Sequence, residues 1–89
     1  MKSQTTGRFW SCLAALPAEV QNPAAKNYAL WRTDARHPSL FFKRIAGPGR
    51  RFSVRVGAHY RAVGREIEGG VEWVWIGTHA EYDHLLKRG

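Results

Sequence analysis

The first third of the chain places apolar residues at every third or fourth position, which is the period of an amphipathic helix. The first such segment holds Phe9, Leu13 and Leu16, and Thr5 or Thr6 can cap its start. The following proline ends this segment and can open the next helix. The second apolar stripe comprises Val20, Ala24, Tyr28, Trp31 and Ala35. Two antiparallel helices joined by a short turn are therefore predicted.

The second helical segment contains a proline in its first half. Either Asn22 caps a helix that begins at Pro23, or the helix bends at this point. The stretch RHPS at 36–39 is expected to end the helix, because a residue that precedes proline avoids the helical conformation.

The period changes to that of strands in the second half of the chain. Aromatic and β-branched residues fill four short segments, at 40–45, 51–56, 60–67 and 71–76. Residues 57–59 and 68–70 are tight connections, so the last three strands are expected to form an antiparallel meander. A final helix is predicted at 79–87, since Thr78 and Glu81 have the spacing of a capping box. Gly77 is expected to separate it from the last strand.

Alternation within the strands indicates which side chains face a core. At 51–56, Phe52, Val54 and Val56 point one way and Ser53 and Arg55 the other, so Arg55 is expected on the open face of the sheet. Lys43 is expected to be exposed on the first strand. At 71–76 both faces are apolar, as in a strand buried on both sides. For 60–67 alternation alone does not decide which face is inside.

These elements define an α+β fold. The predicted architecture has two N-terminal antiparallel helices packed on one face of a twisted, four-stranded, mainly antiparallel sheet, followed by a short C-terminal helix. The helices are expected on the same sheet face. Eighty-nine residues suit a single domain over 1–89.

Positive charge is concentrated in the middle of the chain. The net charge is +7, and residues 32–65 hold nine Lys or Arg residues and one acid. Residues 66–83 hold five acids and no Lys or Arg. A basic cluster of this kind attracts polyanions, although charge alone does not separate nucleic acid from an acidic protein partner.

Several classes of function are disfavoured. The single cysteine, Cys12, cannot form an internal disulfide, and no apolar run approaches the roughly 20 residues that span a bilayer, so a cytoplasmic protein without a membrane partner is expected. The N-terminus lacks the apolar core of a signal peptide. The four histidines show no closed ligand spacing, and no glycine-rich nucleotide motif occurs, so neither a metal nor a cofactor is predicted.

The stretch WVWIGTHAEYDHLL at 73–86 carries candidate acid–base groups. Cleavage of RNA without a metal needs a base for the 2′-hydroxyl, an acid for the leaving oxygen and cations beside the phosphate. His79, Tyr82, Arg55 and Lys43 are residues of the right types. The alternative is purely structural: His79 belongs to the first turn of a helix, and Tyr82 anchors a core against Phe9 or Trp10.

Four segments in this order resemble the RelE/ParE superfamily of bacterial type II toxins: LPAEVQNPAAKNYALW, HPSLFFKRI, FSVRVGAHYRAVG and VEWVWIGTHAEYDHLL. The similarity is strongest to the compact branch that ends in an IGxHAEYDxLL-like segment. Pro23 departs from the uninterrupted helix of the family. The resemblance implies two helices on a curved antiparallel sheet and a cognate antitoxin as partner.

The resemblance also implies one of two activities. Most such toxins cut mRNA on the ribosome, whereas the ParE branch inhibits DNA gyrase. Arg55 and Lys43 match basic positions of the RNases, and His79 and Tyr82 lie where those enzymes carry C-terminal catalytic residues, so these four are the predicted catalytic set. An antitoxin-binding remnant without activity is a third possibility. Further basic residues are predicted to bind RNA: Arg44, Arg50, Arg51, Arg61 and Arg65. An acidic antitoxin segment is expected to cover Arg55 and Arg61.

Overall fold

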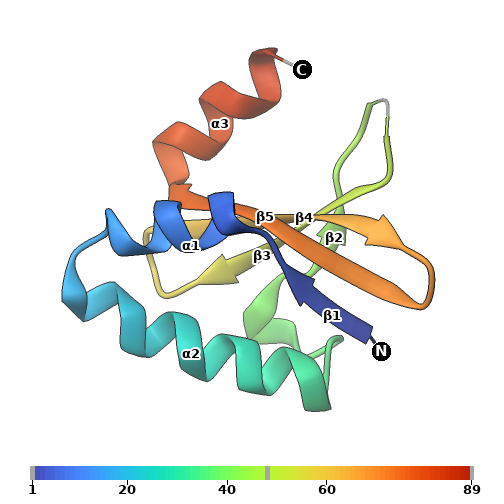
Figure 1. The fold of residues 1–89 in the computed structure, drawn as a ribbon, viewed down its shortest axis with the longest axis horizontal. Coiled ribbons are helices and arrows are strands. Elements are labelled where there is room, and N and C mark those ends of the chain that lie inside the picture. The colour runs from blue at the N-terminus through green and yellow to red at the C-terminus, as the bar shows by residue number, and fades with distance from the viewer. Residues whose placement is uncertain (1, 48, 89) are drawn as a thin grey trace.

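The computed structural model describes residues 2–47 and 49–88, with the side chain of residue 88 excepted. A five-stranded sheet has the order β1-β5-β4-β3-β2 and is flanked by helices (Figure 1). Strands β1 and β5 pair in parallel, and the other three pairings are antiparallel within the described residues. The elements in chain order are β1 (Lys2–Thr5), α1 (Gly7–Ala14), α2 (Ala18–Thr33), the 3-10 helix η1 (Pro38–Leu40), β2 (Lys43–Arg44), β3 (Arg51–Val56), β4 (Tyr60–Ile67), β5 (Gly70–Thr78) and α3 (His79–Arg88).

Helices cover both faces of the sheet. On one face, α1 and α2 close a core around Trp31, Val54 and Trp73. On the other face, Tyr82 of α3 packs against Val63 and Ile45, and Figure 1 shows α2 and α3 on opposite sides of the sheet. The expectation that all helices share one face was therefore wrong for α3. The reason is that β5 is apolar on both faces, so the second face also needs a cover.

The sheet has one strand more than the sequence predicted. Residues 2–5 have no apolar alternation, yet they pair in parallel with β5, with Lys2 opposite Gly70 and Thr5 opposite Trp73. The Lys2 N–H donates to the Gly69 carbonyl at 2.8 Å. A side chain on Gly70 would overlap the backbone of Lys2. Backbone hydrogen bonding and this close approach hold β1, and neither leaves a hydrophobic pattern in the sequence.

The strand predicted at 40–45 is shorter than expected. Residues 38–40 form η1, Phe41 adopts a left-handed conformation with φ 47°, and only Lys43 and Arg44 pair with β3. The proline at 38 fixes the helical φ that starts η1, and the left-handed residue then turns the chain into the sheet. Leu40 is completely buried in the first core.

Helix α2 spans Ala18–Thr33 with Pro23 inside it, so Asn22 is not its N-cap. Pro23 removes one intrahelical donor. The helix is nevertheless kept by tertiary packing, since Val20 and Trp31 on either side of the proline are buried in the same core. Helix α1 ends at Ala14, before the predicted Leu16.

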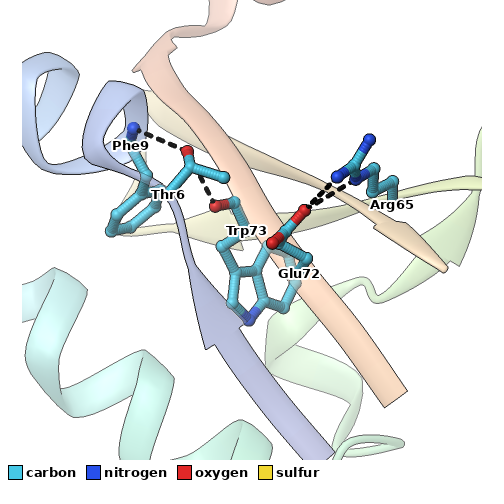
Figure 2. A network of polar contacts seen from close by, with 5 residues as sticks. All are labelled: Thr6, Phe9, Arg65, Glu72 and Trp73. Carbon is cyan, nitrogen blue, oxygen red and sulfur yellow. Dashed lines mark hydrogen bonds and ion pairs between the residues drawn. The ribbon is translucent and has the colours of Figure 1, made fainter. Parts of the chain in front are cut away.

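The two predicted N-caps of α1 and α3 are present. Figure 2 shows the Phe9 N–H donating to the Thr6 hydroxyl, at 3.1 Å. At α3 the Glu81 N–H donates to the Thr78 hydroxyl at 3.1 Å, and the Thr78 N–H donates to the Glu81 carboxylate at 2.9 Å. This confirms the capping box and the helix at 79–87. Gly77, however, lies within β5 and not after it.

Strand register resolves the question of faces. Phe52, Val54 and Val56 contact the α1–α2 core as predicted, and Ala62 joins them from β4. Val63, the next residue, contacts α3. On β5 a register shift opposite Val63 and Gly64 changes the phase of the side chains. Trp73 consequently points to the α1–α2 core and Trp75 to the α3 side.

Candidate functional site

The candidate site lies on the sheet face that carries α3, which we call the basic face. Arg55 pairs with Arg61 across β3 and β4, and Arg51 pairs with Arg65 four residues along the ladder. Residues opposite one another in a ladder share a face, so these four arginines form two cross-strand pairs on one surface. Cross-strand pairs of like charge repel each other, which makes this surface receptive to a negatively charged ligand.

A pocket of about 270 Å³ opens on the basic face between the start of α3 and the turn that follows β3. Its lining residues are Phe41, Arg55, Ala58, Tyr60, Arg61 and His79. Three segments that are separate in the sequence therefore meet: the residue after η1, the β3–β4 hairpin, and the first residue of α3. Two of the predicted catalytic residues, Arg55 and His79, are brought together in this way.

Arg55 is held in place from several sides. Its Nε donates to the Gly57 carbonyl at 3.0 Å, and its guanidinium carbon lies 5.3 Å from the centroid of the Phe41 ring. From α2, the Asn27 side chain donates to the Arg55 carbonyl at 2.7 Å. A cation fixed by hydrogen bonds and by an aromatic ring loses little freedom when it binds an anion, so Arg55 is preorganised for phosphate.

Arg61 is the second cation of the pocket. Its guanidinium carbon lies 5.2 Å from the centroid of the Tyr82 ring, and its Nη1 donates to the Ser53 hydroxyl at 3.4 Å. Ser53 is fully buried beneath this part of the face. Helix α3 thus supports Arg61 through the ring of Tyr82.

His79 lines the pocket from the start of α3. Its backbone N–H donates to the His59 carbonyl at 2.9 Å, which ties the start of α3 to the β3–β4 hairpin. The side chain is 57% exposed, and its Nε2 lies 3.8 Å from the Asp83 carboxylate one turn later. An accessible imidazole at a pocket is a residue type that can take up or release a proton in a reaction.

The Glu81 carboxylate sits in the same first turn but has a structural role. The pKa of Glu81 is held below its ordinary value of 4.5. The main cause is the hydrogen bond from the Thr78 backbone N–H, and the second is the hydrogen bond from the Thr78 hydroxyl. Both donors stabilise the charged carboxylate, so Glu81 remains ionised and keeps the start of α3, and hence His79, in position.

Tyr82 is buried and does not lie on the surface of the basic face. It is 3% exposed, its ring centroid is 6.0 Å from that of His79, and its hydroxyl has no hydrogen-bond partner among the described residues. It packs with Ile45 and Val63, not with Phe9 or Trp10 as the structural alternative supposed. In this arrangement its ring supports Arg61, and its hydroxyl is shielded from the pocket.

Lys43 is exposed on β2, where it pairs with Ser53 on the basic face. Arg55 lies two residues further along β3. A diagonal neighbour of this kind is about 7–8 Å away, so Lys43 can reach an anion held by Arg55 with its long side chain.

The five arginines predicted to bind RNA differ in their surroundings. Arg50 pairs with Glu66 at 3.0 Å, and Figure 2 shows Arg65 bound to Glu72, with an Nε–Oε1 distance of 2.7 Å. Arg44 pairs with Phe52 on the opposite sheet face. Only Arg51 and Arg61 combine a place on the basic face with the absence of an acidic partner among residues 2–47 and 49–88.

Sequence reasoning missed Phe41, Tyr60 and Ala58 as pocket residues. Phe41 and its neighbour Phe42 look equivalent in a short apolar run. The structure separates them, since Phe42 stacks on Phe52 with a centroid distance of 5.2 Å while Phe41 is 51% exposed. The only local signal was the preceding HPSL, which can start a short turn of helix.

A second pocket, of about 300 Å³, opens on the opposite face between α1, α2 and the sheet. Its lining includes Trp31, Trp73 and Trp10 but no Lys, Arg, His, Asp or Glu residue. The indole N–H groups of Trp31 and Trp73 are buried without a partner among the described residues. Acid–base or phosphate chemistry has no suitable groups there, so we place the candidate site on the basic face.

A metal-dependent site finds no support in these side chains. Within residues 2–47 and 49–88, no group of three or more His, Cys, Asp or Glu residues could hold a metal ion.

In the same part of the chain, no helix is both long and apolar enough to cross a bilayer.

Comparisons with known proteins agree with this architecture. The model of the ParE-like toxin domain family matches residues 18–84. A chain of the RelB–RelE antitoxin–toxin complex from Methanococcus jannaschii superposes with a TM-score of 0.72, at 16% identity over 91% of this chain and 96% of that one. A copper-bound mutant toxin from Helicobacter pylori gives a TM-score of 0.58, at 16% identity over 90% and 96%. No curated protein sequence matches this chain significantly.

The chain therefore belongs to the ParE-like toxin domain family. It is a toxin of the RelE/ParE superfamily, as its sequence motifs predicted. The two structural similarities, at 16% identity, establish the shared fold and no more.

Proposed function

We propose that this toxin is a metal-independent endoribonuclease that cuts mRNA on the ribosome and thereby stops translation. The observation that carries the proposal is the pocket in which Arg55 and Arg61 lie together with His79. It combines two cations for a phosphate with one group that can move a proton near neutral pH. An activity on translating ribosomes belongs to the cytoplasm, in keeping with the single unpaired Cys12.

The reaction that fits these groups is transesterification within the RNA strand. The 2′-hydroxyl loses its proton to a base and attacks the neighbouring phosphorus. The bond from phosphorus to the 5′-oxygen breaks, an acid protonates that oxygen, and the products are a 2′,3′-cyclic phosphate and a 5′-hydroxyl. Negative charge grows on the non-bridging oxygens in the transition state, where fixed cations stabilise it most.

Each residue has a role in this scheme. Arg55 and Arg61 bind the non-bridging oxygens, and Lys43 assists from β2. His79 transfers a proton, and the Asp83 carboxylate lies 3.8 Å from its Nε2. Tyr82 is the second candidate acid or base. Because its hydroxyl is buried, that role requires α3 to shift when RNA binds, whereas support of Arg61 does not.

Cleavage of messages on programmed ribosomes, read at nucleotide resolution, tests the proposal. His79→Ala is expected to lower the rate by about 10²–10⁴-fold, the usual contribution of general acid–base catalysis. Lys26→Ala, which removes an exposed cation from α2, is the matched control and should cut like the parent. Tyr82→Phe keeps the ring that supports Arg61, so a loss of rate there would assign a catalytic role to the hydroxyl.

An inhibitor of DNA gyrase is the second candidate, because the matching family model describes a ParE-like toxin. Supercoiling by purified gyrase distinguishes the two. If the parent and His79→Ala both inhibit supercoiling and the parent cuts no message on the ribosome, the RNase assignment is wrong and gyrase inhibition replaces it. If neither target responds, the chain is an antitoxin-binding remnant without activity.

We further propose a cognate antitoxin as partner, with an acidic segment lying across Arg55 and Arg61. The like-charged pair on β3 and β4 supports this, since an acidic segment relieves the repulsion and blocks the pocket. A complex of antitoxin and toxin is known for the similar fold from Methanococcus jannaschii. Affinity for the antitoxin should fall as salt rises and should fall further in Arg61→Ser than in Lys26→Ser. An interface that avoids both arginines would contradict the proposal.

A further inference from the structure

Phe41 combines two features that are unfavourable for a phenylalanine. Its backbone is left-handed, with φ 47° and ψ 43°, a conformation that is unfavourable for residues other than glycine. Its side chain is 51% exposed to solvent. Glycine or asparagine would make the same turn with less strain. The fold therefore does not require an aromatic residue at this position.

The core does not depend on Phe41 either. The adjacent Phe42 supplies the packing, with its ring 5.8 Å from that of Trp31 and 5.2 Å from that of Phe52. Phe41 instead faces the pocket on the basic face, which it lines together with Arg55, Arg61 and His79. A large apolar ring is thus kept at the edge of a cationic pocket, at a cost in backbone strain.

The position of Arg55 leaves part of the ring available. The Arg55 guanidinium lies over the ring at 5.3 Å from its centroid, while half of the residue stays exposed. An aromatic residue that stays half exposed while an arginine lies over its ring resembles the platforms on which single-stranded nucleic acids place their bases. The neighbouring arginines would hold the phosphate that is attached to such a base.

We propose that Phe41 is a stacking platform for one nucleobase of the RNA next to the phosphate that Arg55 and Arg61 bind. The inference rests on the proposed ribonuclease function and names a binding subsite for it. Stacking on an aromatic ring tolerates any base, so Phe41 contributes affinity without choosing the sequence. The expected contribution is about 5- to 150-fold in affinity, the equivalent of one stacked base.

The test is single-turnover cleavage on programmed ribosomes at a series of toxin concentrations. Phe41→Gly is the informative variant, because glycine relieves the left-handed strain and should fold at least as well as the parent. Its half-saturating concentration should rise by about 5- to 150-fold. Phe41→Trp should retain the parent value. Trp10→Leu removes an exposed aromatic from the opposite face, 56% accessible, and should have no effect.

Messages with a single abasic nucleotide, placed at successive positions of the codon, locate the base. At one position, loss of the base should weaken binding of the message by the parent but not by Phe41→Gly. The abasic nucleotide and the Phe41→Gly substitution each remove the same stacking contact, so the second change has no further effect. If Phe41→Gly saturates like the parent while Arg55→Ala is impaired, the platform is wrong and the ribonuclease assignment stands. If the parent cuts no message at all, both fail.

Discussion

The two faces of this sheet differ in how completely helices cover their strands. The more completely covered face holds the larger core, and the less covered face holds the candidate site. Among the described residues, the face under α1 and α2 gathers nine buried apolar residues, with Trp31, Phe42 and Trp73 in contact. In the part of the chain that the structure describes, the basic face has three buried core residues, of which Tyr82 belongs to the short α3. Arginines occupy the positions that α3 leaves uncovered, at the end of β3 and the start of β4.

The same strand serves both faces. On β3, Val54 is buried under the helices while Arg55 faces the pocket on the other side. A rigid core on one side therefore fixes the backbone from which the cations project on the other. Asn27 makes the link directly, since it reaches from α2 to the Arg55 carbonyl. Four substitutions, ordered from the largest expected effect to the smallest, test this division.

Trp31→Ala should have the largest effect on the free energy of unfolding. Trp31 is 2% exposed and contacts Tyr28, Phe42 and Trp73 through its ring. Truncation leaves a cavity that costs about 3–5 kcal/mol, a large share of the stability of a small domain. Urea unfolding measures the loss. A change below about 1 kcal/mol would mean that the helical face is not the main source of stability.

Arg55→Ala should leave stability almost unchanged and remove most of the cleavage activity that we propose. The rate of message cleavage should fall by about 10²–10³-fold, because a fixed cation beside the phosphate is lost. The unfolding midpoint in urea should stay close to that of the parent, since Arg55 contributes to no apolar core cluster. Equal losses of stability and of activity would break the division between the two faces.

Gly77→Ala tests whether α3 must sit closely on the basic face. A Cβ at this position would lie 2.5 Å from the Trp75 ring and 3.1 Å from the Glu81 carboxylate. Overpacking of this kind costs about 1–3 kcal/mol. Because His79 begins α3, message cleavage should fall as well as stability. Unchanged stability, measured by thermal unfolding, would show that α3 can move away from the sheet without penalty.

Thr78→Ala should have the smallest effect, a loss of about 1 kcal/mol from the cap of α3. This contribution depends on pH through Glu81. The donors of Thr78 lower the pKa of Glu81 in the folded state. The stabilisation that Glu81 contributes is therefore present above pH 4.5, and it is lost as the pH falls through the lower pKa of the folded state. The stability difference between the parent and Glu81→Gln should therefore shrink below about pH 4. A difference that does not change with pH would exclude this role.

Local patterns in the sequence determined much of the architecture. The helical period, the strand alternation at 51–56 and the capping box at Thr78 and Glu81 each specify an element within a few residues of its position. They succeed because the forces behind them act over one turn or one strand. The placement of Arg55 opposite the helical core followed from the same alternation.

Only the tertiary structure decided the features that depend on distant contacts. Polar residues 2–5 became a strand because the backbone of β5 offers hydrogen bonds beside Gly70. The register shift near Val63 sent Trp73 and Trp75 to different faces, which alternation in one strand cannot foresee. The pocket itself joins Phe41, Arg55 and His79, whose side chains have no fixed spacing in the chain. The sequence by itself determined the residue types, and packing in three dimensions decided which of them meet, because burial on both sheet faces selects one arrangement from many locally acceptable ones.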